Sequence, residues 1–221
     1  MKKQLFIIGP IVISTLLIAA IVTPGCVPSQ NLQQKQEQKQ VTLRSTPTLN
    51  LTDDAVRVMM KLHNFFCNDN SWSNKRKCVY RNPKGTGIHN NYEKRSKDGS
   101  EVLIDHTSGL MWQHSGSEEI TYEGAKQYIQ KINTEKYAGH DDWRLPTLEE
   151  GMSLMKPTTN KDALYIDPLF DKQQVWIWTS DTTPSINGAS SAWVVSFKWG
   201  YCNSTHGDMF NNLFVRAVRR E

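Results

Sequence analysis

The sequence lacks the short motifs that mark the common catalytic classes. It has no Gly-x-Ser-x-Gly turn of the serine hydrolases and no His-Glu-x-x-His helix of the zinc peptidases. His140-Asp141-Asp142 is the most tempting acid–base or metal cluster, but a polar turn explains it better. We therefore expect a protein that is not an enzyme and that uses no metal and no cofactor.

Charge of one sign is also scarce. The chain has 26 lysines and arginines against 22 acidic residues, a formal net charge of +4, of which Lys2 and Lys3 supply half. The small excess gathers at the end of the chain, in Arg216, Arg219 and Arg220. Such a balance indicates neither a nucleic-acid partner nor a strongly acidic one.

Cysteine is limited to four positions. Cys67 and Cys78 enclose a short polar loop, and a disulfide between them would stabilise the fold by roughly 3 kcal/mol in the loop-entropy model. Cys202 is then left over, so it is either buried and inert or paired with one of these two. No neighbouring motif supports a nucleophilic role for it, and the sequence does not choose between the pairings.

The first 50 residues lack the composition of a globular domain. Lys2 and Lys3 precede an apolar run over residues 5–22, which indicates a secretory signal (residues 1–25), with an uncleaved anchor helix as the alternative. Residues 23–26, Thr-Pro-Gly-Cys, resemble a bacterial lipobox, so we expect Cys26 to be acylated. Residues 26–50 are rich in Gln, Lys, Ser and Thr and predict a disordered tether.

These features place the rest of the chain outside the cytoplasm. The domain would be exported and membrane-anchored in the bacterial cell envelope, on the periplasmic face or at the cell surface. The expected partners are the membrane, through the lipid or anchor helix, and a glycan or envelope protein. The oligomeric state is not predicted.

Residues 51–100 are expected to form an extension before the main domain. Thr52 can cap a helix over residues 53–66. Its buried stripe is predicted from helical spacing as Ala55, Val58, Met59, Leu62 and Phe66. The remainder is polar and is interpreted as a loop closed by Cys67 and Cys78.

Residues 101–221 carry the pattern of one α+β domain. A hairpin is predicted from strands over residues 101–104 and 110–113, and a helix capped by Thr121 runs to about residue 134. Three further strands are expected over residues 176–180, 192–197 and 214–219.

The domain is organised around a structural corner made of Asp142, Trp143, Arg144 and Pro146. Trp143 is expected to be buried, and Pro146 delays the next helix. Arg144 should pair with a carboxylate or with backbone carbonyls, with Asp142 as a plausible partner.

A helix follows this corner directly. Thr147 and Glu150 are spaced as a capping box, and Leu148 and Met152 give the helix a buried face. Gly151 is unexpected there, because glycine in a helix costs up to about 1 kcal/mol relative to alanine.

Six motifs in residues 102–220 resemble one family. They are GLMWQ (109–113), TYEGAKQYI (121–129), DDWRLPTLEE (141–150), WTS (178–180), AW (192–193) and VRAVR (215–219), in that order. The succession resembles the C-terminal (Lcl) domain of bacterial collagen-like proteins, a family of unknown function. The resemblance implies a C-type-lectin-like fold, related to formylglycine-generating enzymes, with two helices packed on a short twisted antiparallel sheet whose first and last strands meet.

The resemblance brings no catalytic residues with it, and some family members are implicated in binding sulfated glycans. The Glu-Pro-Asn and Gln-Pro-Asp loops of calcium-dependent lectins are missing, and Trp178-Thr179-Ser180-Asp181 lacks the Asn of their Trp-Asn-Asp strand. Cys202 stands alone where a formylglycine-generating enzyme needs several cysteines. Neither calcium-dependent sugar binding nor formylglycine chemistry is therefore supported.

The best candidate for a ligand-binding site is the loop over residues 199–210. It puts aromatic faces beside hydrogen-bonding groups, as sugar sites commonly do, in Trp199, Tyr201, Asn203, His206 and Asp208. The alternative is a structured loop with Trp199 and Phe210 turned inwards. Arg216, with Arg219, would either attract a sulfate group or satisfy buried carboxylates.

Three functions follow from these observations, in order of preference. The first is a membrane-tethered, non-catalytic module that binds a glycan or another envelope component. The second is a structural or protein-interaction part of an envelope complex, and the third is an enzyme of unrecognised type.

Overall fold

The computed structural model describes residues 40–68, 80–185, 191–204 and 212–221. Three α-helices are present in these residues, α1 (Asp53–Leu62), α2 (Tyr122–Thr134) and α3 (Leu148–Ser153), with a short 3₁₀ helix η1 (Tyr137–Gly139). The strands are β1 (Tyr92–Lys97), β2 (Ser100–Asp105), β3 (Leu110–Gln113), β4 (Trp176–Thr182), β5 (Ala192–Ser196), β6 (Tyr201–Ser204) and β7 (Val218–Arg220). The fold is α+β, as predicted.

The strands form two antiparallel sheets, whereas the family resemblance implies one. One sheet has the order β1-β2-β3-β7 and the other β4-β5-β6. The first and last strands of the domain share the first of these sheets but do not pair, because β7 pairs with β3, with Trp112 opposite Val218. The predicted strand over residues 214–219 is divided: Phe214 bridges to Ile177 of β4, and only the last residues join β3.

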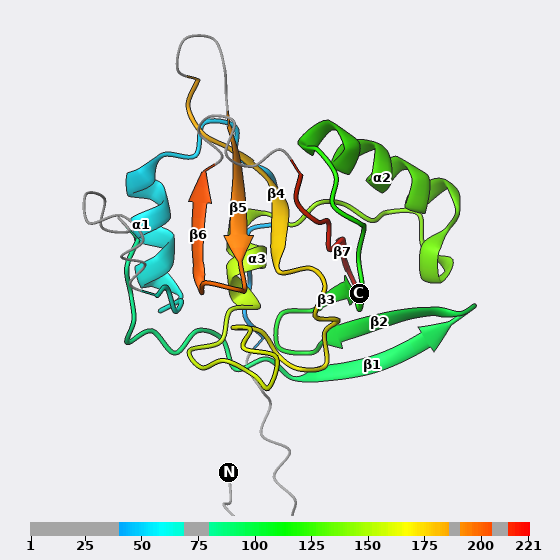
Figure 1. Ribbon diagram of the computed structural model, residues 1–221, viewed down its shortest axis with the longest axis horizontal. Helices are drawn as coiled ribbons and strands as arrows, with labels where there is room; N and C mark the ends of the chain where they lie inside the picture. The colour runs from blue at the N-terminus through cyan, green and yellow to red at the C-terminus, as the bar shows by residue number, and fades with distance from the viewer. Residues whose placement is uncertain (1–39, 69–79, 186–190, 205–211) are drawn as a thin grey trace, which may run out of the picture. The chain divides into compact units, whose positions relative to one another are not determined.

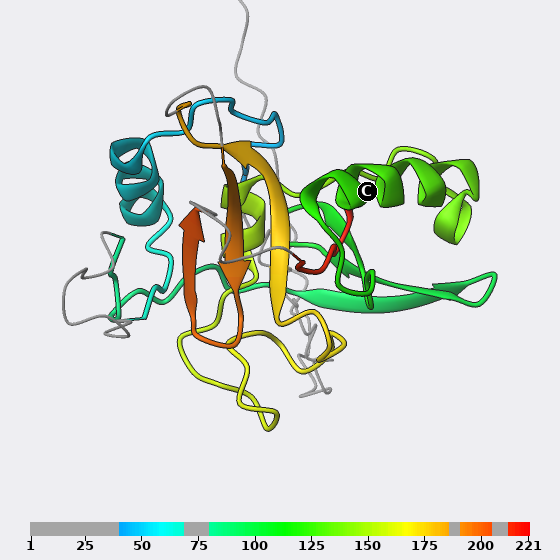
Figure 2. The same ribbon diagram turned by 45° about the horizontal axis from the view of Figure 1, so that its top comes forward.

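The helices surround the β4-β5-β6 sheet on different sides. Figures 1 and 2 show α1 beside β6, α3 behind β4 and β5, and α2 on the side away from α1. Two hydrophobic clusters result: one joins α1, α3 and the inner side chains of β5, and the other lies beneath α2 around Trp143 and Trp178.

Gly151 is explained by the close packing of α3 on this sheet. A Cβ at Gly151 would lie 3.0 Å from Val195 Cγ2 of β5. Alanine would favour the helix by up to about 1 kcal/mol, but overpacking costs about 1–3 kcal/mol. We expect Gly151→Ala to lower the free energy of unfolding by about 1 kcal/mol, measured by urea denaturation.

The double variant Gly151→Ala, Val195→Ala provides the control. Removing Cγ2 of Val195 makes room for the new methyl group. Val195→Ala should therefore lower the free energy of unfolding less in the Gly151→Ala background than in the wild type. A stabilising Gly151→Ala would show that the contact is not tight.

The predicted stripe of α1 is partly wrong. Thr52 caps the helix as expected, its side chain accepting from Ala55 N, but the buried residues are Val56, Met59 and Met60. Val58 and Leu62 are 65% and 74% exposed. The helix ends at Leu62 because Asn64 takes a positive φ of 49°. Phe66 is buried as predicted, but it lies in the segment after the helix.

Residues 40–50 pack on the domain, although their composition assigned them to the tether. We call this segment the strap. Leu43 is 2% exposed, and Val41 N donates to Thr107 O at 2.7 Å. The strap is held by a few buried apolar side chains and by hydrogen bonds to residues far away in the sequence. The composition of the segment does not reveal these contacts. The predicted signal, Cys26 and the rest of the tether lie outside the described residues.

No helix within the described ranges is long and apolar enough to span a bilayer. Cys67 and Cys202 are both buried, and no disulfide joins them. The structure thus rules out a pair between Cys202 and Cys67 and shows that Cys202 is buried. Cys78 lies outside the described residues, so a bridge between Cys67 and Cys78 stays a prediction.

Candidate functional site

The corner before α3 has the predicted local geometry. Thr147 caps the helix and forms a capping box with Glu150. Trp143 is 2% exposed, and its indole N–H donates to Tyr137 O at 2.9 Å. Pro146 O accepts from Ser180 N of β4 at 2.8 Å, which ties the corner to the neighbouring sheet.

The predicted partner of Arg144 is wrong. Its guanidinium donates to both oxygens of Glu150, at 2.6 and 2.7 Å, whereas Asp142 binds Arg219 at 2.6 and 3.2 Å. The first turn of α3 brings Glu150 back under Arg144, so the capping residue is also the ion-pair partner. The Arg219 hydrogen bond lowers the pKa of Asp142.

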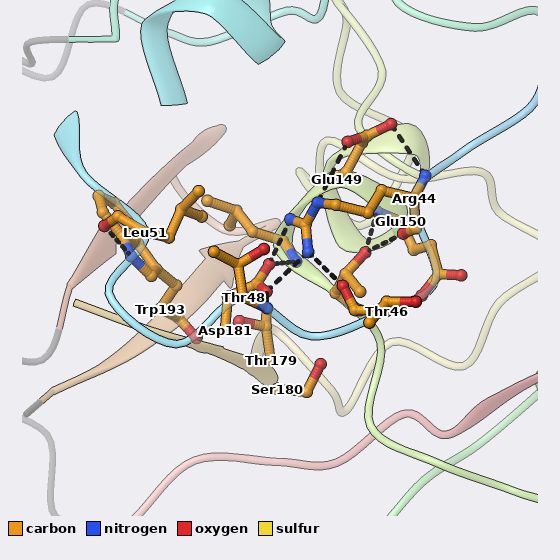
Figure 3. A network of polar contacts seen from close by, with 12 residues as sticks. Arg44, Thr46, Thr48, Leu51, Glu149, Glu150, Thr179, Ser180, Asp181 and Trp193 are labelled. Carbon is orange, nitrogen blue, oxygen red and sulfur yellow. Dashed lines mark hydrogen bonds and ion pairs between the residues drawn. The ribbon is translucent and has the colours of Figure 1, made fainter. Parts of the chain in front are cut away.

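A second buried carboxylate, Asp181 of β4, fastens the strap (Figure 3). It accepts two hydrogen bonds from Arg44, at 2.7 and 2.9 Å, and one each from the backbone N–H groups of Thr48 and Leu148. Asp181 is fully buried. Because every contact is structural, this carboxylate is not placed to act on a substrate.

Glu149 completes the same network on the side of α1. Burial would raise its pKa, but hydrogen bonds from His63 Nε2 (2.9 Å) and Arg44 N (3.0 Å) outweigh burial and hold the pKa below its usual value. His63 is thus a packed residue that holds α1 against the network.

Arg216 is not a surface residue and cannot attract a sulfate group. It is completely buried, and its guanidinium donates to the backbone oxygens of Gln113, His114 and Asp171 and to Gln174 Oε1. Burial lowers its pKa to about 10. The residue joins the end of β3 to the loop before β4, so its role is structural.

Trp199 is 41% exposed, so the alternative in which its side chain turns inwards is wrong. Tyr201 is partly buried and meets Trp176 edge-on, with ring centroids 5.5 Å apart. Asn203 is partly buried, and its Oδ1 accepts from Ser204 N. His206, Asp208 and Phe210 lie outside the described residues.

The turn that carries Trp199 is held on both sides. Trp199 N donates to Ser196 Oγ at 3.2 Å, and Asn68 N donates to Gly200 O at 2.7 Å. Gly200 has a φ of 72°, and a Cβ there would lie 3.0 Å from the Tyr165 ring. The exposed indole is therefore fixed on a turn that only glycine can complete.

A shallow depression of ≈ 410 Å³ lies next to this turn. It is lined by Asp162, Ala163, Leu164, Lys172, Val175 and Lys198. Lys198 Nζ lies 5.5 Å from the centroid of the Trp199 ring, and Lys172 Nζ lies 3.9 Å from Asp162 Oδ1. We call Lys172, Val175, Lys198 and Trp199 the Lys198–Trp199 site.

The sequence predicts only the aromatic part of this site. Lys198 could have been found from its position beside Trp199, but Lys172 comes from a loop whose path no local pattern reveals. Among the residues with described positions, no group of three or more His, Cys, Asp or Glu side chains could hold a metal ion.

Comparison with known families gives one match: residues 101–219 match the Lcl C-terminal domain. The chain belongs to this family. The function of the family is unknown, and it is not known as catalytic. No curated protein and no solved structure matches the chain.

The Lcl C-terminal domain of this chain contains the corner, Arg216 and the Lys198–Trp199 site. The strap and α1 precede it, yet both belong to the same packed unit, since Arg44 binds Asp181 and His63 binds Glu149. The Lcl C-terminal domain therefore has an N-terminal extension that is part of its core here.

Proposed function

We propose that this protein is a non-catalytic binding module that is exported, tethered to the membrane of the cell envelope, and recognises a glycan or another envelope component. The observation that carries the proposal is the exposed indole of Trp199 on a rigid turn beside two lysines and a shallow depression. Aromatic side chains offer large contact area at low conformational cost, and they are frequent anchors of binding surfaces.

The chemistry of the site favours a ring-shaped ligand with a negative group. The face of Trp199 can stack on a sugar ring, while Lys172 and Lys198 can attract a sulfate or carboxylate substituent. Because both lysines are at the surface, their attraction should weaken as the ionic strength rises.

The buried charged groups support the non-catalytic part of the proposal. Glu150, Asp181 and Arg216 are each completely buried, and each is engaged in structural hydrogen bonds. A catalytic acid or base instead needs a free oxygen or nitrogen within hydrogen-bonding distance of a substrate.

The test is a glycan-array screen of the full chain, purified in detergent, with and without calcium and at two salt concentrations. We expect salt-sensitive binding that does not need calcium. Trp199→Ala should weaken it at least about tenfold, the loss typical of an anchor residue. Leu49→Ala is the matched control, since Leu49 is 72% exposed and lies beside Thr182, at the opposite end of the β4–β5 pair.

Equal losses for the two variants would contradict a role for Trp199. Calcium-dependent binding would place the ligand elsewhere. A blank array from folded protein would favour the second candidate, an interaction part of an envelope complex. One observation speaks for that candidate: Val58 and Leu62 lie one helical turn apart on α1 and are both exposed.

A further inference from the structure

Three side chains outside the Lys198–Trp199 site form a chain of hydrogen bonds. Lys156 Nζ donates to Asn90 Oδ1 at 2.9 Å, and Asn90 Nδ2 donates to Asp105 Oδ2 at 2.9 Å. Asn90 precedes β1, Asp105 ends β2, and Lys156 follows α3, so the group joins three separate segments. An amine, a carboxamide and a carboxylate thus lie in sequence within contact distance.

The carboxylate of this group is fixed in place. Asp105 is completely buried and also accepts from Asn91 N, Thr107 N and Ser108 Oγ, at 3.0, 3.1 and 2.6 Å. The Asp105 carboxylate therefore has a fixed orientation, and it orients the Asn90 side chain through their hydrogen bond.

The amine is partly withdrawn from water. Lys156 is half-buried, and its Nζ lies 5.7 Å from the centroid of the Tyr92 ring. Burial lowers the pKa of Lys156, although the negative charges of Asp167 and Asp105 oppose this effect. A lower pKa leaves more of the amine neutral, and only the neutral amine is a nucleophile.

The backbone near both reacting side chains is also held. Lys156 N donates to Tyr165 O at 3.0 Å, and Pro157 restricts the conformation of the residue before it. Beside Asn90, His106 N donates to Asn91 O at 2.9 Å. Two groups held within contact distance react with a high effective concentration.

We propose that Lys156 and Asn90 condense to an intramolecular isopeptide bond, with Asp105 as the proton carrier. The lone pair of neutral Lys156 Nζ attacks Asn90 Cγ and forms a C–N bond. Asp105 accepts a proton released from the attacking nitrogen and delivers it to Asn90 Nδ2. The Cγ–Nδ2 bond then breaks and ammonia leaves, so one amide replaces another and no oxidant or further reactant is needed.

The new bond would join the segment before β1 to the segment after α3. It would close a covalent loop over residues 90–156, which contains the β2–β3 hairpin, α2 and the corner. A link of this kind survives reducing conditions, which a disulfide does not.

The test is peptide mapping of the full chain by mass spectrometry after trypsin digestion. Trypsin does not cut before proline, so Lys156 stays inside a peptide of residues 145–161, and Asn90 lies in a peptide of residues 85–94. We expect one branched peptide whose mass is that of these two less one ammonia. Lys156→Arg should give two separate peptides.

Two variants sharpen the test. Lys161→Arg is the matched control, because Lys161 lines the same surface depression as Lys156 and should leave the branch intact. Asn90→Ala removes the carboxamide that Lys156 attacks, so this variant should give the two peptides separately. Recovery of both peptides separately from folded wild-type protein would overturn the proposal.

Discussion

Replacing Arg216 with methionine is expected to lower the free energy of unfolding by about 3 kcal/mol. The substitution removes the hydrogen bonds to three backbone oxygens and to Gln174 Oε1, of which His114 O keeps a second donor, Asp171 N. Each buried acceptor left without a donor costs about 1–3 kcal/mol. Methionine carries no charge and so avoids the cost of burying one. The lowering of the Arg216 pKa to about 10 corresponds to a cost of about 3 kcal/mol. The lost hydrogen bonds outweigh this relief.

Urea denaturation followed by tryptophan fluorescence measures the loss. Arg95→Met is the matched control, because Arg95 pairs with Glu93 at the exposed edge strand β1; such pairs contribute little, so its midpoint should stay nearly unchanged. Arg216→Lys should also destabilise the protein, since one ammonium cannot reach acceptors arranged for a planar fork. An Arg216→Met protein as stable as the wild type would contradict the structural role of this residue.

Replacing Arg44 with methionine is expected to cost about 3 kcal/mol as well, for a different reason. The change leaves Asp181 as a fully buried carboxylate that keeps only two backbone donors. Removing one partner of a buried pair costs about 3–5 kcal/mol, and the lower figure applies because Arg44 is partly exposed.

A double-mutant cycle separates the pair from the rest of the strap. Asp181→Asn should also destabilise the protein, but Arg44→Met together with Asp181→Asn should cost clearly less than the sum of the single changes. Limited proteolysis should cut the strap faster in Arg44→Met than in Arg95→Met. Additive effects would mean that Arg44 and Asp181 do not act as a pair.

The sequence predicts those parts of the fold whose partners are near in the chain. The caps at Thr52, Thr121 and Thr147 each bind a backbone N–H three residues on, and all three are present. The hairpin of β2 and β3 is equally local. These features follow from short-range geometry, and for that reason composition and spacing are sufficient to find them.

The errors concern contacts between distant residues. The sequence suggests Asp142, two residues away, as the partner of Arg144, whereas helix α3 supplies Glu150. Arg44 of the strap pairs with Asp181, more than a hundred residues away. Strands β1 and β6 are rich in polar residues, and they form because β2 and β5 offer edges to pair with. Propensity does not reveal such strands.

Only part of the candidate site could be predicted, because some of its residues come together from distant positions in the sequence. Trp199 was identified from its aromatic neighbours, and its exposure agrees with a binding role. For Arg216 the sequence leaves open whether it attracts a sulfate group or satisfies buried carboxylates, and the packing shows that it is buried against backbone oxygens and Gln174 Oε1. Lys172 joins the site through the path of the loop before β4.

The most direct test of the Lys198–Trp199 site is the set of tryptophan indole signals in an NMR titration of the full chain. A glycan retained in the array is added stepwise, and Trp199→Phe assigns the signal of Trp199 by its loss. We expect that signal to move with saturation, while the signals of the buried Trp112, Trp143 and Trp193 stay in place. Saturable binding that leaves the Trp199 signal unmoved would contradict the proposed site.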